Sequence, residues 1–171
     1  MNFLFVIFAM VGATYSLIAG SAPAVANDWK REEVVDRMTD EVSVWYRADS
    51  SHAFDCGNGL SDAQIFLTCT STGPAALLGT TNCYFFDDHV ISFRVDKHPK
   101  DMLLATPQDS GKSVHLGSLV NPSRPSHLLA AIRSGKTLLI ELNPAYSEKE
   151  IVEFGVEGLM DVVGSDFDQC R

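Results

Sequence analysis

The run Asp109-Ser110-Gly111-Lys112-Ser113 contains Gly-Lys-Ser, the end of the loop with which many ATP-binding proteins hold phosphate. That loop also needs a glycine five positions before Gly111, so that backbone amides can approach the phosphate, and this chain has Thr106 there. Because the first glycine is missing, we interpret the run as a surface turn and not as a nucleotide site.

The histidines do not form any pattern that is typical of a metal site. No H-E-x-x-H motif is present, and Asp87-Asp88-His89 is the best local grouping of possible ligands. A solvated turn explains these three residues better. Asp166-Phe167-Asp168 lacks the glycine and the further oxygen ligands of a calcium loop. The sequence therefore predicts no metal and no cofactor. The five histidines are His52, His89, His98, His115 and His127.

No nucleophile is marked by its surroundings. The chain has no G-x-S-x-G motif, and a Cys–His pair such as Cys83 with His89 would have to be assembled by the fold. Paired carboxylates, as in glycosidases, are available in any acidic protein, and nothing singles out one pair. We therefore predict that the protein is not an enzyme, with a small hydrolase as the least favoured alternative.

The four cysteines, in contrast, suggest a structural role. They are Cys56, Cys69, Cys83 and Cys170, an even number that is typical of disulfides in an exported chain. Four cysteines allow three pairings, and their positions in the sequence do not select one. Free buried thiols are a second interpretation, and a zinc site is a weak third because no C-x-x-C pair is present.

The beginning of the chain resembles a secretory signal peptide. Residues 1–26 carry no charged side chain, Phe3 to Ile18 is mostly apolar, and Ala24-Val25-Ala26 is a small-x-small cleavage site. We predict cleavage after Ala26, which leaves residues 27–171 as one domain without a transmembrane segment and gives a periplasmic or secreted location. A retained N-terminal anchor is the alternative.

The net charge of −9 lies entirely within residues 27–171. Such a charge disfavours nucleic acid and anionic lipid as partners, because both are negatively charged. A protein partner in the cell envelope remains, and a basic one would suit this charge.

The pattern of apolar residues predicts an α+β fold, with an antiparallel, sandwich-like meander of six to eight strands and two helices. The clearest strand alternates over Val90 to Lys97, which places Ile91, Phe93 and Val95 on one face. We expect that face to meet the last helix. That helix has Leu159, Val163 and Phe167 spaced by four.

Other expected strands cover residues 65–69, 75–78, 82–86, 112–117, 136–142 and 151–156, and a helix is expected over His127 to Arg133 with Gly135 as its stop. Asp49 to Asp62 is rich in Ser, Gly and Asn and is predicted to be a loop. Trp29 to Arg37 is compatible with either a helix or a strand, because both periods occur around it.

Arg94 stands in the middle of the clearest strand, on the face opposite Ile91, and precedes Asp96 by two positions. An exposed ion pair between Arg94 and Asp96 is the simplest interpretation, and such a pair is worth less than about 1 kcal/mol. A buried arginine–carboxylate pair between the sheet and a helix is the alternative.

Several features in order resemble the VasI-type exported bacterial proteins that are found beside type VI secretion genes. The features are Trp29, the Asp36-Arg37-Met38-Thr39-Asp40 run before a strand, the strand end Leu67-Thr68-Cys69, the Val90 to Asp96 strand, and Phe154, Gly158, Leu159 and Cys170 near the end of the chain. The similarity extends thinly over most of residues 27–171.

The resemblance implies a periplasmic accessory or immunity-like factor without catalytic activity. It also implies that Trp29 to Arg37 is a strand followed by a hairpin turn at Met38 to Glu41. It implies that Cys69 pairs with Cys170 and, with those two taken, Cys56 with Cys83. We therefore expect a non-catalytic binding or accessory protein with a link to a secretion system, or alternatively an inhibitor that blocks a partner enzyme.

Overall fold

The computed structural model describes residues 29–71, 73–119, 126–164, 166–167 and 170. Residues 1–28, which include the expected signal peptide over residues 1–26, lie outside this described part. The described chain is mostly antiparallel sheet, with two short helices, α1 (Ser126–Ile132) and α2 (Leu159–Val163). The antiparallel sheet and the two helices confirm the coarse prediction.

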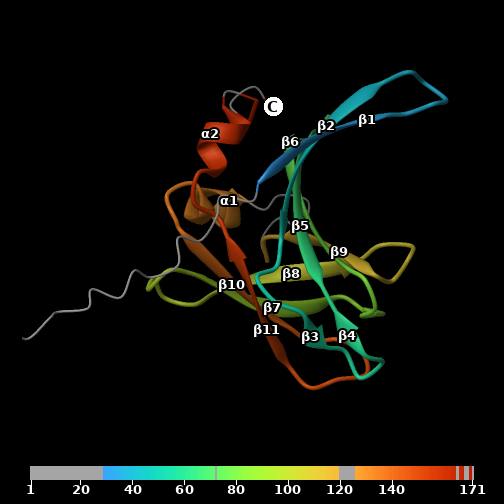
Figure 1. Cartoon of the computed structure of the whole chain (residues 1–171), viewed down its shortest axis with the longest axis vertical. Coiled ribbons are helices and arrows are strands. Elements are labelled where there is room, and N and C mark those ends of the chain that lie inside the picture. Colours follow the sequence, from blue (N-terminus) through green and yellow to red (C-terminus); the bar gives the residue numbers. More distant parts are fainter. Residues whose placement is uncertain (1–28, 72, 120–125, 165, 168–169, 171) are drawn as a thin grey trace, which may run out of the picture.

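Nine strands of the described chain form one antiparallel sheet, instead of the six to eight expected. Its order is β1-β2-β5-β6-β9-β8-β7-β10-β11 (Figure 1). The strands are β1 (Lys30–Val35), β2 (Val42–Asp49), β5 (Ala63–Thr70), β6 (Gly73–Thr80), β7 (His89–Val95), β8 (Asp101–Pro107), β9 (Ser113–Gly117), β10 (Thr137–Leu142) and β11 (Glu150–Gly155).

The sheet curls until its two sides meet. Ser50, just after β2, forms an isolated bridge with Phe154 of β11, and the backbone N–H of Ser51 donates to the carbonyl of Glu153 at 2.8 Å. Only β1 lies beyond this closure, as a strand that is paired on one side by β2. A curled sheet encloses one face of its strands, and that face becomes the core.

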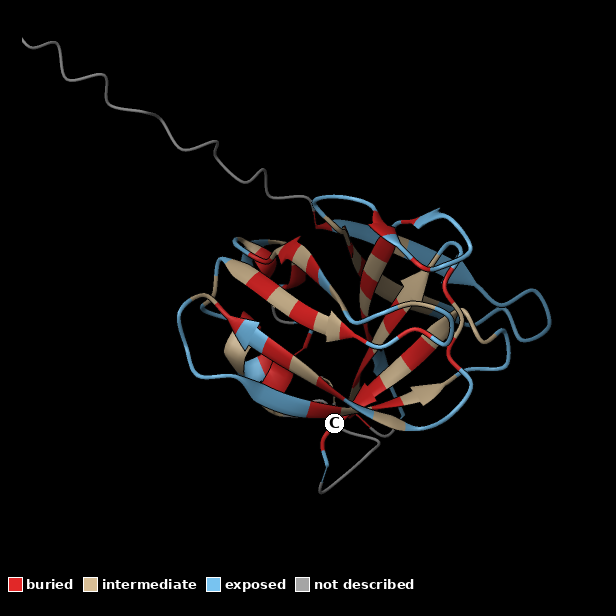
Figure 2. Ribbon diagram, turned by 90° about the horizontal axis from the view of Figure 1, so that it is seen from below, coloured by how far each residue is buried: buried red, intermediate tan, exposed pale blue. Residues whose placement is uncertain are grey.

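Side chains alternate between the enclosed and the outer face, which Figure 2 shows as alternating buried and less buried bands along the strands. Cross-strand partners share a face, so that Ile65 of β5 faces Leu78 of β6, and Phe93 of β7 faces Ile140 of β10. All four are buried, and each such side chain contributes about 1.5–3 kcal/mol on burial. The predicted inward face of the clearest strand is confirmed, since Ile91, Phe93 and Val95 are all buried.

The two helices lie at one end of the curled sheet (Figure 1). The ring of Phe93 contacts His127 of α1, with centroids 6.0 Å apart, so the β7 face lies next to α1. The buried side of α2 instead packs near Leu67 and Leu129, and Phe167 contacts Tyr46 at 5.7 Å. The last helix therefore covers a different part of the sheet from the one expected, because the chain after β11 returns towards β1 and β2.

The structure decides three local expectations. Within Trp29 to Arg37, Lys30–Val35 forms the strand β1, so the strand that the resemblance implied is confirmed. The turn into β2 covers residues 36–41 and therefore begins two residues before the expected Met38. The expected loop Asp49 to Asp62 contains a small second sheet of β3 (Phe54–Asp55) and β4 (Leu60–Ser61). Asn82 to Phe86 was expected to be a strand but joins none, because β6 pairs with β5 and β9 and leaves no neighbouring position in the sheet for this segment.

Asp96 fastens the junction between β7 and β10. Its carboxylate accepts hydrogen bonds from the backbone N–H groups of Lys136, at 3.1 Å, and Thr137, at 2.9 Å. Its own N–H donates to the carbonyl of Thr137 at 2.9 Å. The backbone of Asp96 has a positive φ of 50°, a conformation in which Asp and Asn are better tolerated than most residues. The carboxylate therefore stabilises a tight turn that carries the chain from the end of β7 past the start of β10.

Replacing Asp96 should separate the contribution of its carboxylate hydrogen bonds from that of its left-handed backbone. We expect Asp96→Ala to lower the free energy of unfolding by about 2–3 kcal/mol, because it removes a charged acceptor and leaves a β-carbon in the left-handed region. Asp96→Asn keeps an acceptor and should cost least, and Asp96→Gly relieves the backbone and should lie between the two. Urea unfolding of the three variants measures this order. Equal stability of the Ala and Asn variants would contradict the role of the carboxylate.

Candidate binding surfaces

The four cysteines lie in two pairs at disulfide distance. Cys56 is next to Cys83, with Cα atoms 5.2 Å apart, and Cys69 is next to Cys170, with Cα atoms 5.5 Å apart. Both separations are within the ordinary range for a disulfide. These are the pairs that the resemblance implied, and they use all four cysteines of the chain. Cys83 is thus paired with Cys56 at disulfide distance. It does not form the Cys–His pair with His89 that a nucleophilic thiol would need.

The two disulfides differ in their access to solvent. Cys56 and Cys83 are both buried, whereas Cys69 is exposed and Cys170 is half-buried. The first pair ties the segment around β3 and β4 to the extended segment after β6, and the second ties the end of the chain to β5. Each bridge therefore fixes a part of the chain that contributes little to the sheet itself.

Arg94 lies exposed on the outer face of β7, and the ion pairs and hydrogen bonds of the described residues do not join it to Asp96. The carboxylate of Asp96 is held instead by the backbone of β10, so the expected ion pair is not formed. β7 ends at Val95, and Asp96 has a left-handed backbone from which its carboxylate reaches the N–H groups of Lys136 and Thr137.

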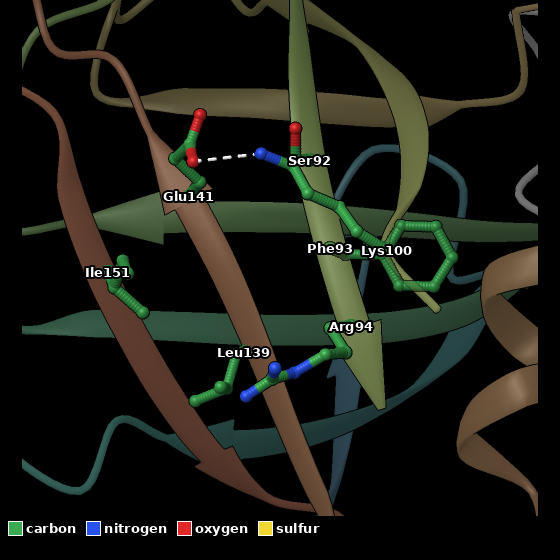
Figure 3. A pocket seen from close by; sticks show the side chains of 7 residues that line it. All are labelled: Ser92, Phe93, Arg94, Lys100, Leu139, Glu141 and Ile151. Carbon is green, nitrogen blue, oxygen red and sulfur yellow. Dashed lines mark hydrogen bonds and ion pairs between the residues drawn. The ribbon is translucent and has the colours of Figure 1, made fainter. Parts of the chain in front are cut away.

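The outer faces of β7, β10 and β11 form a shallow pocket of about 190 Å³ around Arg94 (Figure 3). Leu139 lies directly across from Arg94 in the register, and Ile151 of β11 lies across from Glu141. Lys100 Nζ lies 3.1 Å from Glu141 Oε2, the dashed contact in Figure 3, and Lys149 Nζ lies 2.8 Å from Oε1 of the same residue. The pocket is small for a drug-sized ligand, and its polar groups are mainly an ion-pair cluster.

The two lysines lower the pKa of Glu141 below its usual value, through the hydrogen bond from Lys149 first and that from Lys100 second. Glu141 therefore stays ionised and paired, and it is poorly suited to act as a general base near neutral pH. The sequence analysis named Arg94 but missed these neighbours, because Lys100, Glu141 and Lys149 become close only when β7, β8, β10 and β11 pair.

The hairpin of β1 and β2 projects from the sheet (Figure 1), and its outer part is exposed on both faces (Figure 2). Four large apolar side chains lie on it in contact with solvent, and Met38 in the turn is 92% exposed. Valines are paired across the two strands, with Val35 opposite Val42. The four are Val34, Val35, Met38 and Val42.

A hollow of about 810 Å³ is lined by residues of the hairpin, by the end of β5 and by Asp166. Among the lining residues, the hydroxyl of Tyr46 donates to the carboxylate of Asp166, and Arg31 Nε lies 4.0 Å from Oδ2 of that carboxylate. Burial, followed by the hydrogen bond to Asp166, raises the pKa of Tyr46, and a hydrogen bond to Glu33 raises the pKa of Arg31. Tyr46 therefore remains a neutral donor at physiological pH and holds the C-terminal segment against β2.

Within the described part of the chain, no group of three or more His, Cys, Asp or Glu residues is arranged to hold a metal ion. The Gly-Lys-Ser run lies in a turn and at the start of β9, where Lys112 Nζ donates to the carbonyl of Thr81 at 2.9 Å. His89 begins β7 and stacks on Phe85, and its Nδ1 lies 2.8 Å from the carbonyl of Asp87. Lys112 and His89 therefore both have structural contacts.

Comparison with the known protein families, with curated proteins and with solved structures gave no match to this chain. The resemblance to VasI-type proteins therefore stays a prediction. No helix in the described residues combines the length and the apolar character that a membrane crossing requires.

The unequal burial of the two disulfides predicts an order of reduction. Protein purified from an oxidising compartment should show no thiol that reacts with iodoacetamide before reduction. A mild reductant should then open Cys69–Cys170 before Cys56–Cys83, since exchange requires access to a sulfur atom. Alkylation at increasing dithiothreitol concentrations, followed by peptide mass spectrometry, measures this order. Mixed pairs, such as Cys56 with Cys69, would contradict the observed arrangement.

Proposed function

We propose that this protein is a non-catalytic binding or accessory protein of the bacterial periplasm, and that it docks a protein partner of the cell envelope on the β1–β2 hairpin. Residues 1–26 act as the export signal in this proposal, and residues 27–171 form a single, sandwich-like domain. No cofactor takes part. The VasI-type resemblance supports a link to a secretion system.

One observation carries the proposal, namely the exposed apolar surface of the projecting hairpin. Soluble proteins rarely leave neighbouring large apolar side chains in water, and such patches often mark interaction sites. Val35 and Val42 share one face of this short hairpin, Val34 lies on the other face and Met38 in the turn, and none of the four contributes to the core. The free edge of β1 adds unpaired backbone groups, which an extended segment of a partner can use.

The two disulfide-distance pairs support an oxidising location, because such bridges persist in the periplasm and are rare in the cytosol. The net charge of −9 favours a partner with a basic surface, since complementary charge speeds association.

N-terminal sequencing of the exported protein tests the location, and the sequence read should begin at Asn27.

A second candidate is an inhibitor or immunity protein that blocks a partner enzyme. The shape of the hairpin favours it, because a narrow turn with Met38 almost fully exposed at its end can enter a cleft. The two candidates differ in one measurable respect. Binding by an inhibitor abolishes the activity of one tightly held enzyme, whereas binding by an accessory protein does not.

The hairpin predicts which substitutions abolish binding. Met38→Asp should weaken capture of the periplasmic partner by tenfold or more, because a charge at the centre of an apolar contact costs upwards of about 1.4 kcal/mol. Met102→Asp is the matched control, since Met102 is also an exposed methionine but lies on β8. Affinity purification with quantitative mass spectrometry, followed by titration of the purified partner, measures both. Equal binding by the two variants would refute docking on the hairpin.

A further inference from the structure

The segment from Asn82 to Phe86 is held in place although it belongs to no strand. The hydroxyl of Thr80 donates to the carbonyl of Cys83 at 3.0 Å, and the N–H of Phe85 donates to the carbonyl of Gly111 at 2.8 Å. The carbonyl of Tyr84 accepts the N–H of Ala145 at 3.0 Å, and Cys83 is bridged to Cys56. Its backbone is therefore fixed on both sides.

This fixed backbone presents aromatic rings to solvent. Cys83 and Phe85 point into the core and are buried, whereas Phe86 is 59% exposed. From the loop between β10 and β11, Tyr146 joins it at 60% exposure. The two rings meet edge to face, with centroids 5.7 Å apart and planes at 78°. Together they form an open aromatic corner.

Tyr84 stacks on Phe86 and so contacts this corner. Its ring is nearly parallel to that of Phe86, at 6.4 Å and 21°, and Lys112 Nζ lies 5.3 Å from its centroid. Lys112 also donates to the carbonyl of Thr81, so the lysine is already engaged. The accessible ring faces therefore belong to Phe86 and Tyr146, and neither ring is needed by the core.

Phe86 separates two hollows with polar linings. The first, of about 520 Å³, includes Asp87, Asn143 and Ser147 in its lining. The second, of about 430 Å³, includes Gln108, Asp109 and Ser110. Each hollow thus combines an aromatic wall with a carboxylate, an amide and a hydroxyl. The carboxylates accept hydrogen bonds, and the amides and hydroxyls can both donate and accept them. Gln108 Nε2 already donates to the carbonyl of Thr106 and the Ser147 hydroxyl to that of Glu148, so these two groups offer a ligand chiefly their oxygen atoms as acceptors.

This combination selects a particular ligand chemistry. A pyranose ring presents C–H groups on its flat face, and these suit the electron-rich face of an aromatic ring. Its hydroxyl groups lie around the rim, where they meet acceptors and donors of the kind that line the two hollows. The carboxylates of Asp87 and Asp109 disfavour anionic ligands, and Lys112, the nearby cation, is engaged.

We propose that the corner formed by Phe86 and Tyr146 binds a neutral glycan chain. One pyranose unit stacks on the corner, and the units before and after it occupy the two hollows on either side of Phe86. The site is separate from the β1–β2 hairpin, so it adds a second binding activity to the proposed function and does not depend on it.

Titration with defined oligosaccharides tests the proposal. The probes are the trimer of N-acetylglucosamine, cellotriose and maltotriose, each added to the full exported protein and measured by isothermal titration calorimetry. At least one should bind with a dissociation constant below about 1 mM, which corresponds to about −4 kcal/mol. Phe86→Ala and Tyr146→Ala should each weaken that binding at least tenfold, and Phe86→Trp should preserve it because the ring is kept.

Two controls make the result specific. Met102→Ala removes an exposed apolar side chain from β8, and Met38→Asp places a charge in the exposed turn of the hairpin; both should bind the oligosaccharide as the unmodified protein does. Circular dichroism and thermal unfolding check that every variant is folded. The proposal is overturned if none of the three trimers binds at about 5 mM, if the two alanine variants bind normally, or if the aromatic variants abolish capture of a protein partner and leave glycan binding unchanged.

Discussion

A curled antiparallel sheet can enclose only one face of its strands, and this constraint determines where the other residues of the protein lie. Ile65, Leu78 and Val114 fall in one cross-strand row on the enclosed face, and all three are buried. The alternate residues must face outward, where they form the ion pairs around Glu141 and the pocket around Arg94. The bridge between Ser50 and Phe154 closes the sheet, so that one set of side chains is enclosed and the other set faces outward.

The same closure leaves β1 outside the curled part of the sheet. β2 pairs with β5 on one side and with β1 on the other, and the bridge to β11 forms at Ser50, just after β2. Only the side of β1 that faces β2 is paired and its side chains are mostly exposed, so β1 obtains little stability from the core. The contacts at its base compensate for this. Tyr46 binds Asp166, and Cys170 is tied to Cys69, so the C-terminal segment fastens the inner part of the hairpin while the outer part stays exposed.

The sequence allowed good predictions where side-chain periodicity and burial coincide. In β7 the alternating apolar residues Ile91, Phe93 and Val95 are the residues that point to the enclosed face. Both the strand and its buried face were therefore predictable. Asn82 to Phe86 alternates in the same way but joins no strand, because Cys83 and Phe85 are buried through a disulfide and loop contacts instead of a ladder. Periodicity reports which side chains are buried, and it does not report what the backbone pairs with.

The surfaces were less predictable than the fold, since they combine residues that are distant in the sequence. Arg94 was identified from its place in a strand, but its expected partner Asp96 is used by the backbone of Lys136 and Thr137. Tyr146 reaches Phe86 only because the loop after β10 passes beside the segment that Cys56 and Cys83 hold. A signal was present in the sequence, namely three aromatic residues in succession after Cys83, although only Phe85 is needed by the core.

The positions of the two proposed binding surfaces follow from the direction of β2. This strand begins at Val42, beside the hairpin turn, and ends at Asp49, from which the chain enters β3 and β4 at the other end of the molecule (Figure 1). The Cys56–Cys83 bridge joins the aromatic segment to that second end. The hairpin and the aromatic corner are therefore separated by the length of the sheet, and a ligand on one does not obstruct the other. Because the core between them is continuous and closely paired, each surface can be altered by substitution without disturbing the fold that presents the other.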